Sequence, residues 1–209
     1  MRVNYFDLGL YRGVEMGWVV NSIFPNLGIT DYRVYGFEAC KVYAENLSRV
    51  YEKNDKVEIL HNAVCDSEKK IKLYYSPNML GHSIFSTKNN VSENKFEEVQ
   101  GIVFSKWLSD NNVDLTNSLN IMKVNIEGAE WHLFKDLVDS GVNKDIHIFC
   151  GAGHDVEKIG ELKDYIDEYY KLLADNNIHL HRFSEWKPHT NADIVSLIRK
   201  EYSLKEKAI

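Results

Sequence analysis

Residues 120–141, NIMKVNIEGAEWHLFKDLVDSG, hold the pattern that decides the fold. The segment 120–126 is a mostly apolar run that is typical of a strand. In the segment 127–140, apolar side chains recur at helical spacing, and Gly141 stands where a glycine commonly ends a helix. The stretch therefore predicts a strand that passes directly into a helix.

Units of the same kind lie on both sides of this stretch. We expect further strands at Arg2–Leu8, Tyr32–Phe37, 57–64 and 145–150, and further helices at 40–53 and 156–174. This alternation is typical of an α/β fold with a mainly parallel sheet. The segment 66–118 interrupts it, and we expect a β-hairpin-like insertion with a mobile loop on the ligand side.

The end of the chain departs from this pattern. Residues 177–183 and 192–199 have the composition of strands, and the short connection between them contains Pro188. Because such a connection cannot carry a parallel crossover, we expect these two strands to pair antiparallel. We treat 1–209 as a single domain, either complete in itself or part of a longer polypeptide.

Charge and composition exclude several classes of protein. The chain has 25 Lys and Arg against 31 Asp and Glu, a net charge of −6, without the basic stripe that nucleic-acid binders carry. No apolar run is long enough to span a membrane, and the N-terminus lacks a signal-peptide pattern, so we expect a cytoplasmic protein. Three cysteines without a CxxC spacing argue against disulfides and a structural zinc site.

Two glycines follow the first expected strand. Asp7, Gly9 and Gly13 form the pattern DxGxxxG, in which glycines let the backbone turn tightly and approach a ligand. An ordinary turn would look the same. The spacing differs from the GxGxxG of dinucleotide-binding proteins, which counts against a nicotinamide-dependent oxidoreductase.

Polar residues also follow the second and third expected strands. Glu38 is placed either to accept hydrogen bonds from a ribose or to complement the dipole of the next helix. Asn62 and Ala63 could border an adenine ring, or could be a plain strand end.

A row of polar side chains ends the strand 120–126. Lys123, Asn125 and Glu127 alternate along the chain, so they share one face of the strand. A buried polar row needs partners, although surface edge strands carry such rows too. Because Gly128 and a helix follow, we interpret the row as a ligand-facing strand end.

Four segments together resemble a known family. They are YFDLGLYRG (5–13), YGFEA (35–39), HNAV (61–64) and MKVNIEGAE (122–130), in the order and spacing of the FkbM-type methyltransferases, which depend on S-adenosylmethionine (SAM). The resemblance implies a Rossmann-like class I methyltransferase sheet with seven strands, an antiparallel C-terminal strand and helices on both faces.

The resemblance also implies roles for individual residues. The residues that would bind SAM are Asp7, Gly9, Gly13, Glu38, Ala39, Asn62, Ala63 and Asn125. Glu38 would hold the ribose hydroxyls. The acceptor would be a hydroxyl of a sugar or glycoconjugate, as is typical of the family. The candidate acceptor-binding residues are Tyr11, Arg12, His82, Ser83 and Lys123.

The sequence departs from the family pattern at several of these positions. Leu10 and Tyr11 stand in place of Ala-Asn, and Ala39 replaces a proline. Asn125 replaces an aspartate, which removes a negative charge from the expected reaction site. We therefore assign neither a base nor a metal to that position.

An alcohol is a poor nucleophile at neutral pH, so a positioned base would assist methyl transfer. His154, in the glycine-containing loop after 145–150, is the first candidate, and Glu127 is the second. Asp155 could orient the imidazole or bind a sugar hydroxyl. His154 could also be an exposed loop residue, and Glu127 a structural acceptor.

Two other functions stay open. A degenerate SAM-fold domain could serve as a binding or assembly module, an alternative favoured by Tyr11, Arg12 and Asn125. A nicotinamide-dependent oxidoreductase predicts GxGxxG and no antiparallel pair at the end of the chain. For the leading hypothesis we expect a carbohydrate or glycoconjugate acceptor and a possible fused or associated glycan-processing domain.

Overall fold

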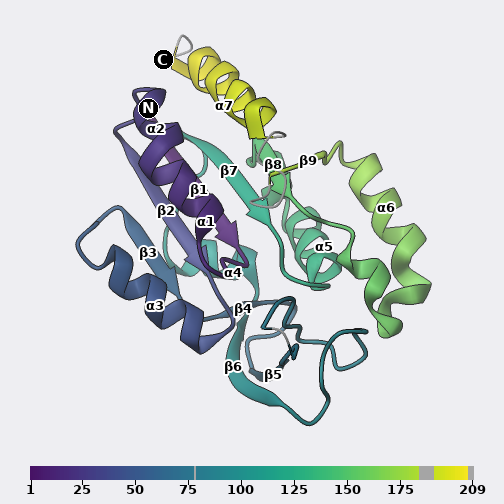
Figure 1. The fold of residues 1–209 in the computed structure, drawn as a ribbon. Helices are drawn as coiled ribbons and strands as arrows, with labels where there is room; N and C mark the ends of the chain where they lie inside the picture. The colour runs from purple at the N-terminus through teal and green to yellow at the C-terminus, as the bar shows by residue number, and fades with distance from the viewer. Residues whose placement is uncertain (78, 184–190, 207–209) are drawn as a thin grey trace.

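The computed structural model describes residues 1–77, 79–183 and 191–206. At its centre lies a six-stranded sheet in the order β3-β2-β1-β7-β8-β9, whose described pairings are all parallel (Figure 1). Its strands are β1 (Arg2–Leu8), β2 (Tyr32–Phe37), β3 (Val57–Leu60), β7 (Ser118–Val124), β8 (Ile148–Gly151) and β9 (Leu180–His181). The strand order reverses between β1 and β7, so the fold is a Rossmann-like α/β fold with a central switch point.

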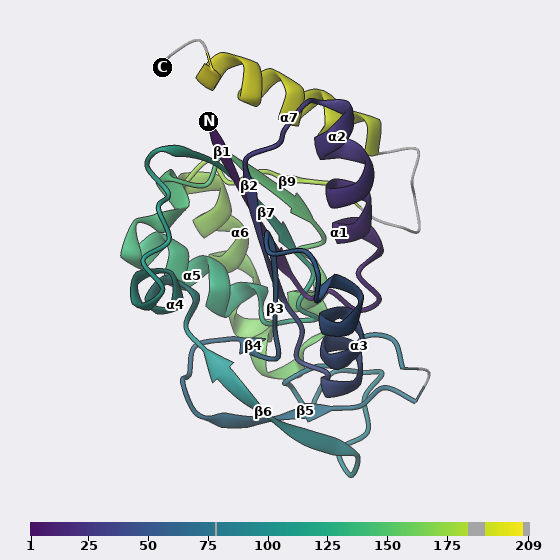
Figure 2. The same ribbon diagram turned by 90° about the vertical axis from the view of Figure 1, so that its left-hand side faces the viewer.

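Helices cover both faces of the sheet (Figure 2). One face carries α1 (Val14–Trp18), the π-helical turn η1 (Val19–Ile23), α2 (Phe24–Asn26), α3 (Lys41–Tyr51) and α7 (Asn191–Glu206). The other carries α4 (Phe104–Asp110), α5 (Glu130–Ser140) and α6 (Ile166–Asp175). The 3₁₀-helices are η2 (Val142–Lys144), η3 (Asp155–Lys158) and η4 (Gly160–Tyr165). Two large buried apolar clusters pack the elements together, as a parallel sheet requires.

Two buried asparagines fix the register between β1 and β7. Asn4 and Asn120 lie opposite each other, and the Nδ2 of Asn4 donates to the Oδ1 of Asn120 at 2.9 Å. Asn4 also donates to the carbonyl of Asp114, and Asn120 to those of Leu115 and Asp145. A slip of one residue would turn Asn4 to the opposite face and leave these buried groups without partners.

The first two strands begin and end where the sequence predicts. The expected strand 57–64 is instead divided into β3 and β4 (Ala63–Val64), which lie in different sheets. The expected helix 156–174 begins as η3 and η4 and becomes α-helical only at Ile166.

The prediction of an antiparallel last strand is wrong. Residues 192–199 lie in the helix α7, and β9 pairs parallel with β8, so the central sheet has six described strands rather than seven. Ile194 and Ile198 are four residues apart and both are buried. Ser196, which would share their face in a strand, is exposed, so this burial pattern suits a helix. The expected connection through Pro188 lies outside the described residues.

A second sheet, β4-β6-β5, lies near the carboxyl ends of the central strands (Figures 1 and 2). In it β5 (Lys70–Tyr74) pairs antiparallel with β6 (Phe96–Ile102). Both strands and α4 belong to the segment 66–118. Between β5 and β6, residues 79–90 supply part of the wall of the cavity described below. We call residues 79–90 the strap.

Candidate functional site

A cavity of about 420 Å³ lies at the carboxyl ends of β1, β2 and β7, beside the switch point of the sheet. Gly9, Glu38 and Asn125, which follow these strands, line it, as do residues of the strap. Ligands of parallel α/β sheets bind at such a position. The volume lies in the range of cavities that hold small-molecule ligands.

A second cavity, of about 380 Å³, adjoins the first. The residues that line both are Gly9, Tyr11, Asn125, Ala152, His154 and Arg182. The second cavity is also lined by Lys123 and by residues near β9. The two cavities therefore meet at the ends of β1, β7 and β8.

Gly9 lies where the loops after β1 and β7 come closest. Its φ is +87°, and a Cβ there would lie 1.9 Å from the carbonyl oxygen of Asn125, so only glycine permits this approach. Gly13 also has a positive φ, but a Cβ there would meet Leu47 of α3, and Gly13 lines neither cavity. Of the two glycines expected to contact a cofactor, the structure brings only Gly9 to the site.

Asp7 and Lys123 form an ion pair within the sheet, with 3.0 Å between Oδ1 and Nζ. Asp7 also accepts a hydrogen bond from the hydroxyl of Tyr5 at 3.2 Å, and Lys123 donates to the carbonyl of Gly9. Burial raises the pKa of Asp7 to about 6, although Lys123 opposes the rise. Asp7 lines neither cavity, so it acts on the site through Lys123 and Gly9.

Glu38 is a buried carboxylate on the wall of the first cavity. Its Oε2 accepts the backbone N–H of Tyr11, and its Oε1 that of Cys40, each at 2.7 Å. Burial raises its pKa to about 7 despite these two hydrogen bonds. The carboxylate therefore stands at the ligand-facing position and also holds two loops together.

Tyr11 lines both cavities and has a positive φ of 50°. Its ring meets that of Tyr43 edge-on at 4.9 Å between centroids. Arg12 is exposed and lies over the ring of Tyr11 rather than in either cavity. The structure thus places Tyr11, but not Arg12, among the possible ligand contacts.

The segments that follow β2 and β3 supply an apolar part of the first cavity. Ala39, Asn62, Ala63 and Val64 line it, together with Ile84 from the strap. The Nδ2 of Asn62 donates to the carbonyl of Gln100 at 3.2 Å, which orients the amide at the rim. These residues suit a flat apolar group with a polar edge.

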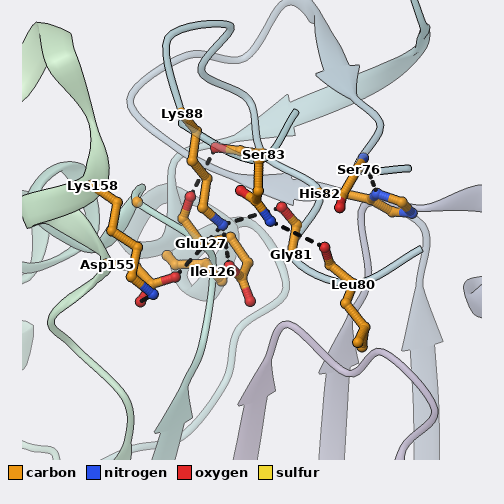
Figure 3. Close-up of polar contacts among 12 residues, drawn as sticks. Ser76, Leu80, Gly81, His82, Ser83, Lys88, Ile126, Glu127, Asp155 and Lys158 are labelled. Carbon is orange, nitrogen blue, oxygen red and sulfur yellow. Dashed lines mark hydrogen bonds and ion pairs between the residues drawn. The ribbon is translucent and has the colours of Figure 1, made fainter. Parts of the chain in front are cut away.

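Lys88 of the strap holds the two expected acids of the site together (Figure 3). Its side chain is 2 % exposed, and its Nζ contacts Glu127 and lies 3.5 Å from the Oδ2 of Asp155. Lys158 binds the other oxygen of Asp155 at 2.7 Å. Glu127, Asp155 and Lys158 line the first cavity, and Lys88 lies behind them.

The two carboxyl groups of this cluster differ in their acidity. Burial and the hydrogen bond with Asp155 raise the pKa of Glu127, against the effect of Lys88. The pKa of Asp155 is lowered. Burial alone would raise it, but the hydrogen bond with Glu127 and the ion pair with Lys158 have the larger, opposite effect. Burial therefore favours the protonated form of Glu127, and the lysines favour the ionised form of Asp155.

Neither Lys88 nor Lys158 is among the residues that the sequence singles out. Lys88 stands in a polar loop without periodicity, so no local pattern marks it as buried. Lys158 follows Asp155 by three residues within η3, a spacing that brings side chains together and could have pointed to the pair. Glu130 was also missed, and its buried carboxylate accepts the N–H groups of Ile126 and Gly128.

His154 lies where the two cavities meet. Its side chain is 62 % exposed, and its Nε2 is 3.6 Å from the Oδ1 of Asp155. Asp155 thus lies beside the imidazole of His154, and it also contacts Lys88 and Lys158.

His82 and Ser83 lie in the strap with different surroundings. His82 lines the first cavity, and its Nδ1 accepts the backbone N–H of Ser76 at 3.0 Å. Burial lowers the pKa of His82. Ser83 is buried and lines neither cavity; its hydroxyl donates to the carbonyl of Glu127 at 2.8 Å. Ser83 thus supports the site without facing it.

Comparisons with protein families, with curated proteins and with solved structures found no match for this chain. Among the described residues, no group of three or more His, Cys, Asp or Glu side chains is placed to hold a metal ion. None of the described helices is both long enough and apolar enough to cross a membrane.

Proposed function

We propose that this chain is a SAM-dependent O-methyltransferase that acts on a hydroxyl of a sugar or glycoconjugate in the cytoplasm. The observation that carries the proposal is the buried carboxylate of Glu38 on the wall of a cavity at the switch point. In Rossmann-like folds, an acidic residue after the second strand binds the ribose hydroxyls of a nucleotide cofactor.

The first cavity suits the nucleoside part of such a cofactor. Each carboxylate oxygen of Glu38 accepts one backbone N–H and retains a lone pair for a ribose hydroxyl. Ala63, Val64 and Ile84 offer an apolar wall to a purine ring, with Asn62 at its edge. Gly9 keeps the loops after β1 and β7 close enough to border both cavities.

SAM, when bound, supplies an electrophilic methyl group on a sulfonium cation. Glu127 gives the first cavity a negative group that favours a cation. His154 would take the proton of the acceptor hydroxyl. Because its Nε2 is directed toward Asp155, Nδ1 is the nitrogen left for that proton. A positioned base of this kind raises the rate by about 10²–10⁴-fold.

The second cavity is the place for the acceptor. Its lining mixes apolar side chains such as Leu173 and Leu180 with the polar Lys123 and His179. A mixed lining of this kind suits a hydroxyl-rich ring. A fused or associated glycan-processing domain would be a natural source of such an acceptor.

Calorimetric titration with SAM and with its demethylated product tests the proposal. We expect micromolar binding by the unaltered chain and binding at least about tenfold weaker in Glu38→Gln. Glu93→Gln, at an exposed position, is the control. Absence of binding by the folded, unaltered chain would reject the proposal. Binding without turnover on a panel of glycan acceptors would favour the binding or assembly module.

A second candidate, a nicotinamide-dependent oxidoreductase, is favoured by one observation. The six described strands follow the all-parallel order of dinucleotide-binding folds, without the antiparallel strand of the methyltransferases. The loop after β1 counts against it, because it lacks GxGxxG and carries Tyr11 on the cavity wall. Titration with oxidised and reduced nicotinamide dinucleotides in the same series separates the two candidates.

A further inference from the structure

Lys88 is an ammonium group enclosed by oxygen atoms from three segments (Figure 3). Its Nζ donates to the carbonyl of Gly81 at 3.1 Å and to the Oε2 of Glu127, and lies 3.5 Å from the Oδ2 of Asp155. An ammonium group has three N–H donors, so one can be directed toward each oxygen. Lys88 thereby connects the strap to the loop after β7 and to η3.

The strap also holds the backbone of Glu127. The hydroxyl of Ser83 donates to the carbonyl of Glu127 at 2.8 Å. Glu127 has a positive φ of 57°, and Gly128 follows with a φ of 114°. A residue other than glycine keeps such a conformation only where its surroundings fix it. The strap therefore fixes both the main chain and the side chain of Glu127.

Lys88 does not face a ligand itself. It lines neither cavity, whereas Gly81, Glu127 and Asp155 all line the first. Any effect of Lys88 on a bound molecule must pass through the groups that it holds.

Charged groups from several elements surround the carboxyl group of Glu127. They are Lys88 from the strap, Asp155 and Lys158 from η3, and Glu130 from α5, while the imidazole of His154 lies beside Asp155. Lys158 binds Asp155 at 2.7 Å. Among the residues that the structure describes, Lys88 is the one cation that forms an ion pair with Glu127.

We propose that Lys88 is a positioning residue that keeps the carboxyl group of Glu127 ionised and, through it, holds the strap against the first cavity. The inference rests on the proposed function, in which Glu127 is the negative group beside a cationic cofactor. A proton on Glu127 weakens its contact with Lys88, so the charge of the cavity and the attachment of the strap change together.

A ¹³C NMR titration of the Glu127 carboxyl carbon, in the protein without cofactor, tests the link. The signal is assigned by its absence in Glu127→Gln. We expect Lys88→Met to raise the pH midpoint of Glu127 by at least about one unit, because an adjacent opposite charge is removed. Lys95→Met, at an exposed lysine, should leave the midpoint unchanged. An unchanged midpoint in folded Lys88→Met would overturn the proposal.

If Lys88→Met does not fold, amide hydrogen exchange of the strap, measured in the unaltered chain and in Glu127→Gln, tests the proposal instead. After correction for intrinsic rates, exchange at residues 81–90 should quicken as Glu127 takes up its proton. In Glu127→Gln, which keeps the shape of the side chain, exchange should be fast at every pH. A strap that exchanges equally slowly in both proteins at all pH values would contradict the proposal.

The affinity for SAM separates this inference from the proposed function. If the pH midpoint of Glu127 shifts in Lys88→Met but the unaltered chain binds no SAM, the link between Lys88 and Glu127 stands and the methyltransferase assignment is rejected. A chain that binds SAM with the same affinity and pH dependence in Lys88→Met would retain the assignment and reject the role of Lys88.

Discussion

The carboxylate of Glu38, at the end of β2, accepts a hydrogen bond of 2.7 Å from the backbone N–H of Tyr11 in the loop after β1. Tyr11 has a positive φ, a conformation that costs a non-glycine residue about 1–2 kcal/mol. The other oxygen of Glu38 accepts the N–H of Cys40, the N-cap residue directly before α3. One side chain therefore keeps two loops of the first cavity in place.

Replacement of Glu38 should lower stability as well as ligand affinity. Glu38→Ala leaves the buried N–H group of Cys40 and the partly buried N–H group of Tyr11 without an acceptor. An unsatisfied buried group costs about 1–3 kcal/mol. Glu38→Gln retains one oxygen and should lose less. Urea unfolding of both variants, with Glu93→Ala as the exposed control, measures the difference. Equal stabilities for Glu38→Ala and the control would contradict the role of Glu38.

Gly9→Ala should be far more harmful than Gly28→Ala. Both glycines have a positive φ, but a Cβ at Gly28 meets nothing within 4 Å, whereas a Cβ at Gly9 lies 1.9 Å from the Asn125 oxygen. Gly28→Ala should lower the free energy of unfolding only by the cost of a positive φ in alanine, about 1–2 kcal/mol. Gly9→Ala adds steric crowding worth at least about 1–3 kcal/mol. The midpoints of thermal unfolding give the comparison, and similar losses would show that the two loops can move apart.

Lys123→Met should destabilise the chain strongly. It leaves the carboxylate of Asp7 buried without its cation, a change that typically costs about 3–5 kcal/mol. The double variant Asp7→Asn with Lys123→Met removes both charges and should recover part of the loss. Lys135→Met, in an exposed ion pair with Asp139, is the control and should change little. A double variant no more stable than Lys123→Met alone would contradict this account.

The stability of the chain should fall as the pH rises from mildly acidic to neutral. Burial raises the pKa of Glu38 and of Glu130 from 4.5 to about 7. At a pH between 4.5 and about 7, the folded chain binds protons that the unfolded chain has released. Each group therefore stabilises the fold fully below its unfolded pKa, and this stabilisation is lost as the pH rises through about 7. Urea midpoints across this range measure the slope, and Glu130→Gln should reduce it. A slope that Glu130→Gln does not alter would count against the raised pKa of Glu130.

His154→Gln should lower turnover without weakening SAM binding. The side chain is exposed and contacts Asp155, so its loss should leave the first cavity intact while it removes the proposed base. We expect turnover to fall by about 10²–10⁴-fold. His181→Gln, at an exposed position that lines neither cavity, serves as the control. Equal turnover in His154→Gln and the unaltered chain would remove His154 from the mechanism.

Much of the central sheet could be predicted because its signals are local. The strands β1 and β2 are rich in valine and aromatic residues, which favour strands, and the sequence places both correctly. The segment 192–199 misled the prediction because isoleucine and valine also favour strands. Its two fully buried residues, Ile194 and Ile198, share one helix face, so packing against the rest of the chain decides the structure there.

The candidate site could be predicted only in part. Residues that follow strands, such as Glu38 and Asn125, reach the first cavity because parallel strands bring their carboxyl ends to one edge. Gly13 and Ser83 do not reach it, because each is enclosed by packing partners distant in the sequence. The burial of Lys88 depends on two acids far along the chain, a relationship that no local pattern encodes.

Asn4 of β1 and Asn120 of β7, which fix the register of these two strands, are 116 positions apart in the sequence. During synthesis β1 leaves the ribosome before its neighbour β7, which follows only after β5, β6 and α4 have been made. Until then β1 has one open edge, and closure of so long a loop slows folding. We therefore expect nascent chains that stop short of β7 to remain prone to aggregation, and folding to complete only after β7 has emerged.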